Sequence, residues 1–141
     1  QEIIKRIMEA EHDPVVVMVD DRGKKGKGPG EAAMESILKD ERLDVLGILA
    51  VSSNEKDCNG VDVTCSITKE GNIIEDAVDK YGNNVHSKKI CGDTLSILKK
   101  IKHGLIIGIG DPGKMDFNDE ISKGAPITTK ALKEILKRSG M

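Results

Sequence analysis

Aromatic side chains are almost absent from this sequence. Tyr81 and Phe117 are the only two, and there is no tryptophan. Proteins that bind single-stranded nucleic acid stack the bases on aromatic side chains, and this chain has almost no such platform. Its 22 basic and 24 acidic residues give a net charge of −2, which provides no general attraction to nucleic acid or to a membrane surface. We therefore expect no nucleic-acid partner.

Long hydrophobic runs and metal-binding motifs are also lacking. No run approaches the length of a transmembrane helix and no secretory signal is visible, so we expect no direct insertion into a membrane. The cysteines Cys58, Cys65 and Cys91 are odd in number and are not spaced for a metal, and the three histidines are scattered. This usage predicts reduced thiols in a reducing compartment.

Three continuous apolar runs are present, at residues 15–19, 45–51 and 105–109. Runs of this kind, bounded by turn signals, predict strands that are covered on both faces, as in a parallel sheet. Helical periodicity predicts helices over residues 2–11 and 30–39, a third helix after an N-cap at Asp93, and a last helix capped by Thr128 or Thr129.

Residues 61–67 show a different pattern, because apolar and polar side chains alternate there. This period predicts a half-exposed strand, and a turn at 70–72 returns the chain antiparallel over 73–78. The sequence of this turn, TKEGN at 68–72, is echoed by DKYGN at 79–83, which predicts a second turn. The hairpin face is also the segment we expect to dock on another protein, with guarding of its own sheet edge as the alternative.

These elements predict a single α/β domain over residues 1–141. The expected architecture is a three-layer sandwich with a mainly parallel sheet, helices on both faces and a β-hairpin insertion. A domain of this kind normally opens with a strand, whereas this sequence opens with a helix at its first residues. We therefore expect that the full-length protein has an N-terminal strand that is missing here.

Polar residues follow each predicted parallel strand, and ligands of parallel sheets bind beyond the carboxyl ends of the strands. Behind the first strand lies a basic, glycine-rich loop that leads into a helix, an arrangement able to hold an anion. The loop is followed by Pro29 rather than by Lys and Ser or Thr, which excludes a P-loop. The predicted ligand-binding residues are Asp20, Asp21, Lys27, Gly28, Gly30, Ser53, Asn54, Asp111 and Lys114.

Three of these residues are carboxylates that would meet at one edge of the sheet, namely Asp20, Asp21 and Asp111. Paired carboxylates suit Mg²⁺, which would bring a phosphate-bearing ligand with it, as in toprim-type folds. The other interpretation is that these acidic residues only shape turns and cap helices. No Ser/His/Asp or Cys/His spacing supports a nucleophile and its base, so we assign no catalytic residue.

Several phrases together resemble one protein family. They are HDPVVVMVDD at 12–21 with GKGPGE at 26–31, DVLGILAVSSN at 44–54, IGIGDPGKMD at 107–116, and GAPITTKAL at 124–132. The chain resembles the soluble form of stage V sporulation protein AE from endospore-forming bacteria, over nearly its whole length. The resemblance also implies an additional N-terminal segment, with a strand and an acidic turn, that is absent here.

The resemblance implies a role in spore formation and germination. The family belongs to a set of proteins that moves dipicolinic acid, chelated to calcium, into and out of the spore. The implied function is that of a soluble accessory or regulatory subunit that binds other stage V sporulation transport proteins and is held at the spore inner membrane through them. The alternative is a Mg²⁺-dependent, toprim-like enzyme or sensor of a phosphate-bearing ligand.

Overall fold

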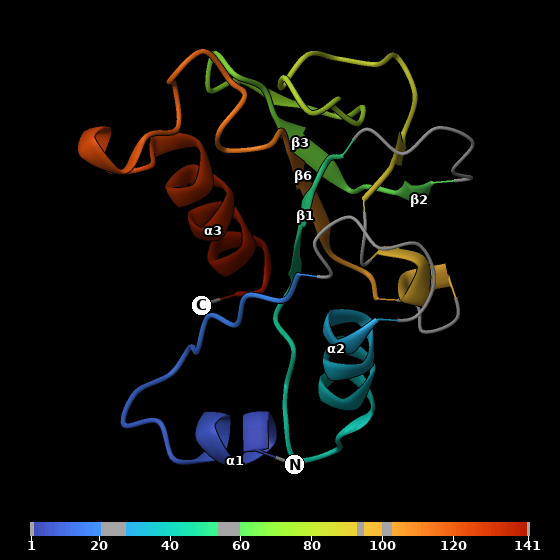
Figure 1. Cartoon of the computed structure of the whole chain (residues 1–141), viewed down its shortest axis with the longest axis vertical. Helices are drawn as coiled ribbons and strands as arrows, with labels where there is room; N and C mark the ends of the chain where they lie inside the picture. The colour runs from blue at the N-terminus through green and yellow to red at the C-terminus, as the bar shows by residue number, and fades with distance from the viewer. Residues whose placement is uncertain (1, 21–27, 54–59, 93–94, 100–102, 141) are drawn as a thin grey trace.

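A computed structural model describes residues 2–20, 28–53, 60–92, 95–99 and 103–140 (Figure 1). Along these segments two helices come first, then five strands, and a sixth strand and a third helix follow, with two short 3₁₀ helices, labelled η, before and after that last strand. The elements are α1 (Glu2–Met8), α2 (Pro29–Lys39), β1 (Ile48–Val51), β2 (Val61–Asp62), β3 (Cys65–Ile67), β4 (Ile73–Ile74), β5 (Lys89–Ile90), η1 (Leu95–Lys99), β6 (Ile106–Ile109), η2 (Ile121–Lys123) and α3 (Pro126–Arg138).

The main sheet has four strands in the order β1-β6-β3-β4. Strand β6 runs parallel to both of its neighbours, with Ile48 of β1 opposite Ile106 and Cys65 of β3 opposite Ile107. Strand β4 pairs antiparallel with β3, and β2 and β5 form a separate antiparallel pair. The prediction that the runs at 45–51 and 105–109 form neighbouring parallel strands is confirmed.

Each face of the main sheet is covered by its own hydrophobic cluster. Ile48 and Ala50 of β1 and Ile106 of β6 pack in one cluster, together with side chains of α2 and η1. Ile107 and Ile109 of β6 pack in the other, against α3. Because neighbouring residues of a strand point to opposite faces, β6 contributes to both clusters. The predicted α/β sandwich, with a mainly parallel sheet and cover on both faces, is confirmed.

Helix α3 buries one narrow stripe against this sheet. Ile127, Ala131 and Ile135 are spaced four residues apart and are 6% exposed or less. This spacing places them on one side of a helix, which is the side that faces β6 and β3. Helix α2 packs Met34 and Leu38 against the opposite cluster.

The prediction of a buried strand at residues 15–19 is wrong. This segment is not assigned to a strand, and its exposure alternates, with Val16 69% and Met18 92% exposed. An apolar run alone does not distinguish a strand inside a sheet from a segment that lies on the surface along one side. The third parallel strand is β3 instead, which the sequence indicated only as part of a hairpin.

The hairpin and two helix boundaries also differ from the expectation. The β3–β4 hairpin forms, but β2 leaves it and pairs with β5. Residues 95–99 form the 3₁₀ helix η1, and the proposed N-cap Asp93 lies outside the described residues. Helix α3 begins at Pro126, so Thr128 and Thr129 lie inside its first turn rather than at its cap.

Truncation of Ile48 tests the two-sided burial of the sheet. Its side chain is 8% exposed, so Ile48→Ala should lower the free energy of unfolding by about 2–5 kcal/mol because it leaves a cavity. The matched control is Val51→Ala in the same strand, where the side chain is 41% exposed and the loss should stay below about 1 kcal/mol. Urea unfolding of both variants measures the difference, and equal losses would contradict the burial of β1.

Candidate functional site

The residues predicted to form a ligand site are only partly described. Asp21, Lys27 and Asn54 lie outside the described residues. Gly28 is the N-cap residue of α2, and Gly30 is buried in the first turn of that helix. The remaining members of the set are Asp20, Ser53, Asp111 and Lys114.

Asp20 and Asp111 are not positioned by the same kind of element. Asp111 follows the carboxyl end of β6, as the sequence predicted. Asp20 ends the segment 15–20, which forms no strand and which, in the view of Figure 1, runs past the amino end of β1. Asp20 and Asp111 are therefore not brought together by neighbouring parallel strands. Among the described residues, no three histidine, cysteine or acidic side chains are grouped closely enough to hold a metal ion.

The carboxyl end of β6 is occupied by the chain itself. The backbone N–H of Asp111 donates to the carbonyl of Lys80 at 2.8 Å. A Cβ atom on Gly110 would lie 2.6 Å from the backbone nitrogen of Gly82 and 2.8 Å from the sulfur of Met115. Only glycine allows so close an approach, and the turn at 79–83 thus fills the place where a parallel sheet would open a crevice.

The Asp111 side chain contacts residues of the turn in which it lies. Its Oδ1 accepts a hydrogen bond from the N–H of Gly113 at 3.0 Å, and its Oδ2 lies 3.6 Å from Nζ of Lys114. This is the behaviour expected of an acidic residue that shapes a turn. Asp111 and Lys114, two of the predicted ligand-binding residues, therefore lie together. Asp111 shapes a turn here, as the second interpretation of the acidic residues expected.

The two turns that echo each other in sequence have the same hydrogen bonds. In the first, Thr68 Oγ1 accepts from the N–H of Asn72, and in the second, Asp79 Oδ1 accepts from the N–H of Asn83. In each turn the first and last residues also pair through N–H and carbonyl at 2.9 Å. The turns contact one another, since the N–H of Lys69 donates to the carbonyl of Gly82 at 3.0 Å. The repeated pattern therefore predicted two equivalent turns, which lie together.

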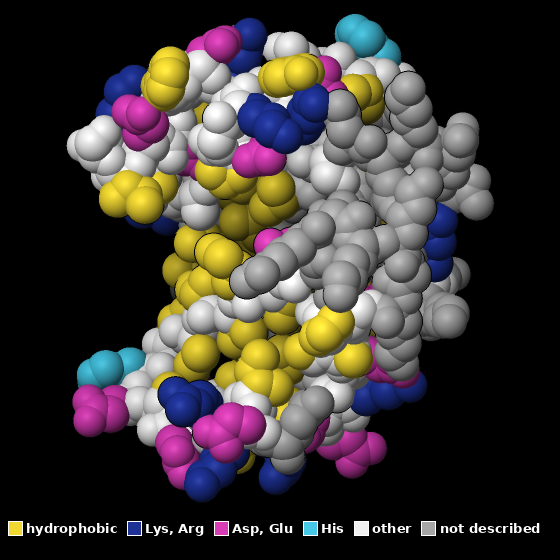
Figure 2. All heavy atoms as spheres, in the orientation of Figure 1, with side chains coloured by type: hydrophobic (Ala, Val, Ile, Leu, Met, Phe, Trp, Pro, Cys, Tyr) yellow, Lys and Arg dark blue, Asp and Glu magenta, His cyan; other side chains and the backbone are white. Residues whose placement is uncertain are grey.

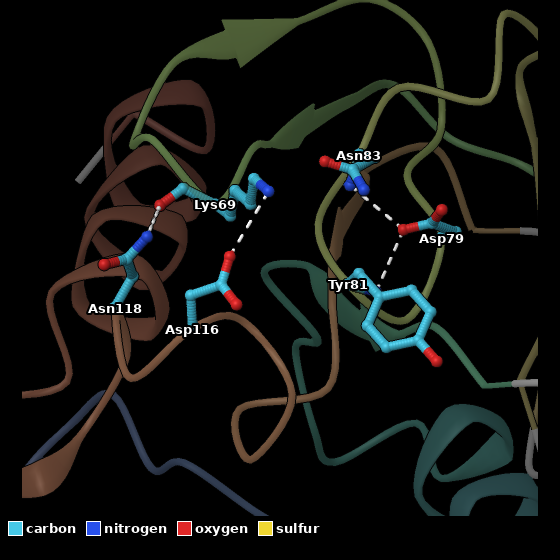
Figure 3. A network of polar contacts seen from close by, with 6 residues as sticks. All are labelled: Lys69, Asp79, Tyr81, Asn83, Asp116 and Asn118. Carbon is cyan, nitrogen blue, oxygen red and sulfur yellow. Dashed lines mark hydrogen bonds and ion pairs between the residues drawn. The ribbon is translucent and has the colours of Figure 1, made fainter.

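Figure 3 shows how the loop after β6 joins these turns. Asn118 donates from its side-chain nitrogen to the carbonyl of Lys69 at 2.9 Å, and Asp116 lies 3.3 Å from Nζ of Lys69. Asp116 and Phe117 both have left-handed backbone conformations, with φ of 53° and 63°. Two consecutive non-glycine residues in this region are unusual, and such conformations persist where the surroundings hold them. Apart from the echoed turns, no sequence pattern predicted these contacts.

Asp119 holds the start of α3 from seven residues away. Its Oδ1 accepts from the N–H groups of Ile127 and Thr128 at 2.8 and 2.9 Å, and its Oδ2 accepts from the Thr128 hydroxyl at 2.6 Å. The residue is 3% exposed. A buried carboxylate at this position satisfies helix N–H groups and interacts favourably with the helix dipole. No local sequence pattern predicted this cap, because Asp119 is not adjacent to the helix in sequence.

The cysteines correct the expectation of reduced thiols. Cys91 is disulfide-bonded, and its carbonyl accepts from the N–H of Ser53 at 2.8 Å. Cys65 is free and buried in β3, and its burial raises the pKa of the thiol. An odd number of cysteines therefore means that one thiol is unpaired, but it does not exclude a disulfide between the other two. A buried thiol with a raised pKa is poorly reactive.

An open groove lies between α1 and the end of α2, lined by Ile4, Ser36, Lys39, Asp40 and Arg42. Asp40 accepts two side-chain hydrogen bonds from Arg42, which lower the pKa of the Asp40 carboxyl to about 2. The Arg42 side chain is exposed and that of Asp40 is half-buried, and the guanidinium and the carboxylate bind one another. The charges of Asp40 and Arg42 are therefore already paired with each other rather than available to a charged ligand.

A sequence model of the stage V sporulation protein AE1 family matches residues 1–139 of the 141. The chain belongs to this family. Membership in the stage V sporulation protein AE1 family implies a role in sporulation. No curated protein and no solved structure matches the chain. In the part of the chain that the structure describes, no helix is both long and apolar enough to cross a membrane.

Replacement of Asp119 tests its role in holding the loop and α3 together. Asp119→Ala leaves two N–H groups at the start of α3 without their acceptor, so we expect a loss of about 2 kcal/mol in the free energy of unfolding. The control is Glu120→Ala, whose side chain, among the described residues, accepts from the Ser122 hydroxyl alone; this change should alter stability by less than about 0.5 kcal/mol. Thermal unfolding compares the two, and similar midpoints would show that Asp119 does not cap α3.

Proposed function

We propose that this chain is a non-enzymatic accessory or regulatory subunit of the machinery that moves calcium-chelated dipicolinic acid into and out of the spore. In this proposal it acts in sporulation and germination by binding other stage V sporulation transport proteins, and it is held at the spore inner membrane through them. The family match over residues 1–139 is the observation that carries the proposal.

The geometry at the end of the parallel sheet supports a binding subunit over a small-molecule enzyme. The turn at 79–83 occupies the carboxyl end of β6, and the Asp111 carboxylate is engaged by its own turn. The polar groups of the surrounding loops bond to one another, as Figure 3 shows for Lys69, Asp116 and Asn118. The Mg²⁺-dependent alternative through Asp20, Asp21 and Asp111 stays a prediction, which metal titration can test.

The β3–β4 hairpin is the docking segment in this proposal. Strand β4 is one of the two edge strands of the described four-stranded sheet, and Ile73 in it is 43% exposed. An edge strand presents unpaired backbone groups that proteins either protect or use to add a strand from a partner. Glu70 and Glu75 flank β4 and are exposed, which is consistent with protection when no partner is bound.

A pull-down against the other stage V sporulation transport proteins tests the hairpin. Ile73→Lys should weaken capture about tenfold or more, because it removes an apolar contact from the docking edge. The matched control is Met8→Lys in α1, where an apolar side chain of similar exposure, 51%, receives the same change away from the hairpin. Circular dichroism of both variants establishes that they are folded.

Two outcomes would contradict the proposal. If folded Ile73→Lys and Met8→Lys variants are captured as well as the unchanged chain, the hairpin is not the docking segment. If the isolated chain releases phosphate from a phosphate-bearing substrate, the non-enzymatic function is wrong.

A further inference from the structure

The charge of this acidic chain is unevenly distributed. Residues 123–138 contain five bases and one acid, a net charge of +4, in a chain whose net charge is −2, so the remaining residues carry −6. The one acid, Glu134, pairs with Arg138 at 2.9 Å. The lysines of this segment therefore remain as a concentrated positive charge at one part of an otherwise acidic molecule.

These lysines form one face of α3. At about 100° per residue, Lys130, Lys133 and Lys137 fall within an arc of about 60° on the helix. All three are exposed, and they lie opposite Ala131 and Ile135, which pack against the sheet. We call Lys130, Lys133 and Lys137 the lysine face. It lies on the side of α3 that does not pack against the sheet, and its first member, Lys130, reaches the turn between β3 and β4.

The lysine face is not neutralised by acidic groups. Among the described residues, none of its three ammonium groups forms an ion pair with a carboxylate; Lys130 donates to the carbonyl of Gly71 instead. Lys123 of η2 likewise donates to a backbone carbonyl, that of Phe117, at 2.9 Å. Four lysines are thus left for an external anion to balance.

Two strongly exposed apolar side chains precede the lysine face. Ile121 in η2 is 91% exposed, and Phe117 is 70% exposed. In Figure 1 the segment that contains η2 projects beyond the first turn of α3, outward from the sheet. The loop that carries these side chains is held by buried groups, because Asp119 binds the start of α3 and Met115 is fully buried. The loop with the two apolar side chains is therefore held at the start of α3, the helix that carries the lysine face.

The apolar side chains visible elsewhere on the molecule are arranged differently. Figure 2 shows apolar side chains along the hollowed middle of the face in view, with charged side chains at its upper and lower ends. Ile121 is instead flanked in sequence by Glu120 and Ser122 and is almost completely exposed, with Lys123 two residues on. A single apolar side chain that projects from a polar loop is suited to insertion between the headgroups of a membrane surface.

We propose that the lysine face, with Lys123, Ile121 and Phe117, binds the surface of an anionic lipid bilayer. The ammonium groups contact lipid phosphates, and the two apolar side chains enter the boundary between headgroups and acyl chains. The remaining residues carry a net charge of −6, which favours an orientation in which the lysine face meets the anionic surface. This contact is made directly by the chain and does not depend on the docking segment proposed above.

The chemistry of the face favours lipid over an acidic polypeptide. Its charges are lysines, which act as hydrated point charges, whereas planar recognition of carboxylates is typical of arginine. Arg138, the one arginine of α3, is already paired with Glu134. An acidic peptide would also give no reason for Ile121 and Phe117 to be exposed beside the charges, whereas amphipathic membrane-surface segments combine both features.

Co-sedimentation of the full chain with vesicles tests this proposal. One set of vesicles is phosphatidylcholine alone, and the other contains about 30% phosphatidylglycerol as the anionic lipid. We expect binding to the anionic vesicles only, with a loss of binding as the salt concentration rises from about 0.1 M to about 0.5 M. Neutralising Lys130, Lys133 and Lys137 to Gln should lower the partition coefficient about a hundredfold.

Two further variants make the result specific. The charge-matched control changes Lys5, Lys88 and Lys99 to Gln; these are exposed lysines of other elements, and their loss should leave binding within about threefold of the unchanged chain. The apolar variant combines Ile121→Ser with Phe117→Asn, because asparagine tolerates the left-handed backbone at position 117. It should lower binding at least about tenfold while leaving the salt dependence in place.

Three results would overturn the proposal. The first is equal binding to neutral and anionic vesicles, and the second is equal loss in the lysine-face variant and its charge-matched control. The third is binding to polyglutamate without binding to anionic vesicles, which would assign the lysine face to an acidic polypeptide. Circular dichroism and thermal unfolding of every variant separate loss of binding from loss of the fold.

Discussion

The structure depends on the burial of β6 on all sides. It has a parallel strand at each edge and a hydrophobic cluster on each face, and all four of its residues are buried. Strand β1 and helices α2 and α3 are positioned by contacts with it or with the clusters it separates. The carboxyl end of the strand directs the chain into the loop at 111–125, which is the part of the molecule with the most unusual backbone. Strand β6 therefore positions both the core of the fold and the exposed loop that follows it.

Much of this fold could be predicted from the sequence because its signals are local. The apolar runs at 45–51 and 105–109 predicted β1 and β6, and apolar periodicity predicted α1, α2 and α3. The turns at 68–72 and 79–83 were predicted from a repeated sequence pattern, in which glycine and a side-chain acceptor occupy the same places. The prediction of a buried strand at 15–19 was wrong because burial is not a local property. Whether other elements cover this run depends on residues far away in sequence.

The candidate site was less predictable than the fold. Its residues were chosen because they follow parallel strands, and this reasoning placed Asp111 correctly at the end of β6. It had no means to foresee that a distant turn, at 79–83, would occupy the same place. The cap of α3 was missed in the same way, because Asp119 reaches the helix across an intervening loop. Interactions of this kind are set by tertiary packing, which short sequence patterns do not encode.

The chain itself closes the carboxyl end of β6, and this closure supports the proposal that this member of the stage V sporulation protein AE1 family acts by binding other proteins. Amide hydrogen exchange of the native protein tests the closure most directly. The N–H of Asp111, bonded to the Lys80 carbonyl, should exchange as slowly as that of Ser52, bonded to the Ile109 carbonyl; both distances are 2.8 Å. Fast exchange at Asp111 while Ser52 stays protected would show that the turn lifts away and that the crevice opens.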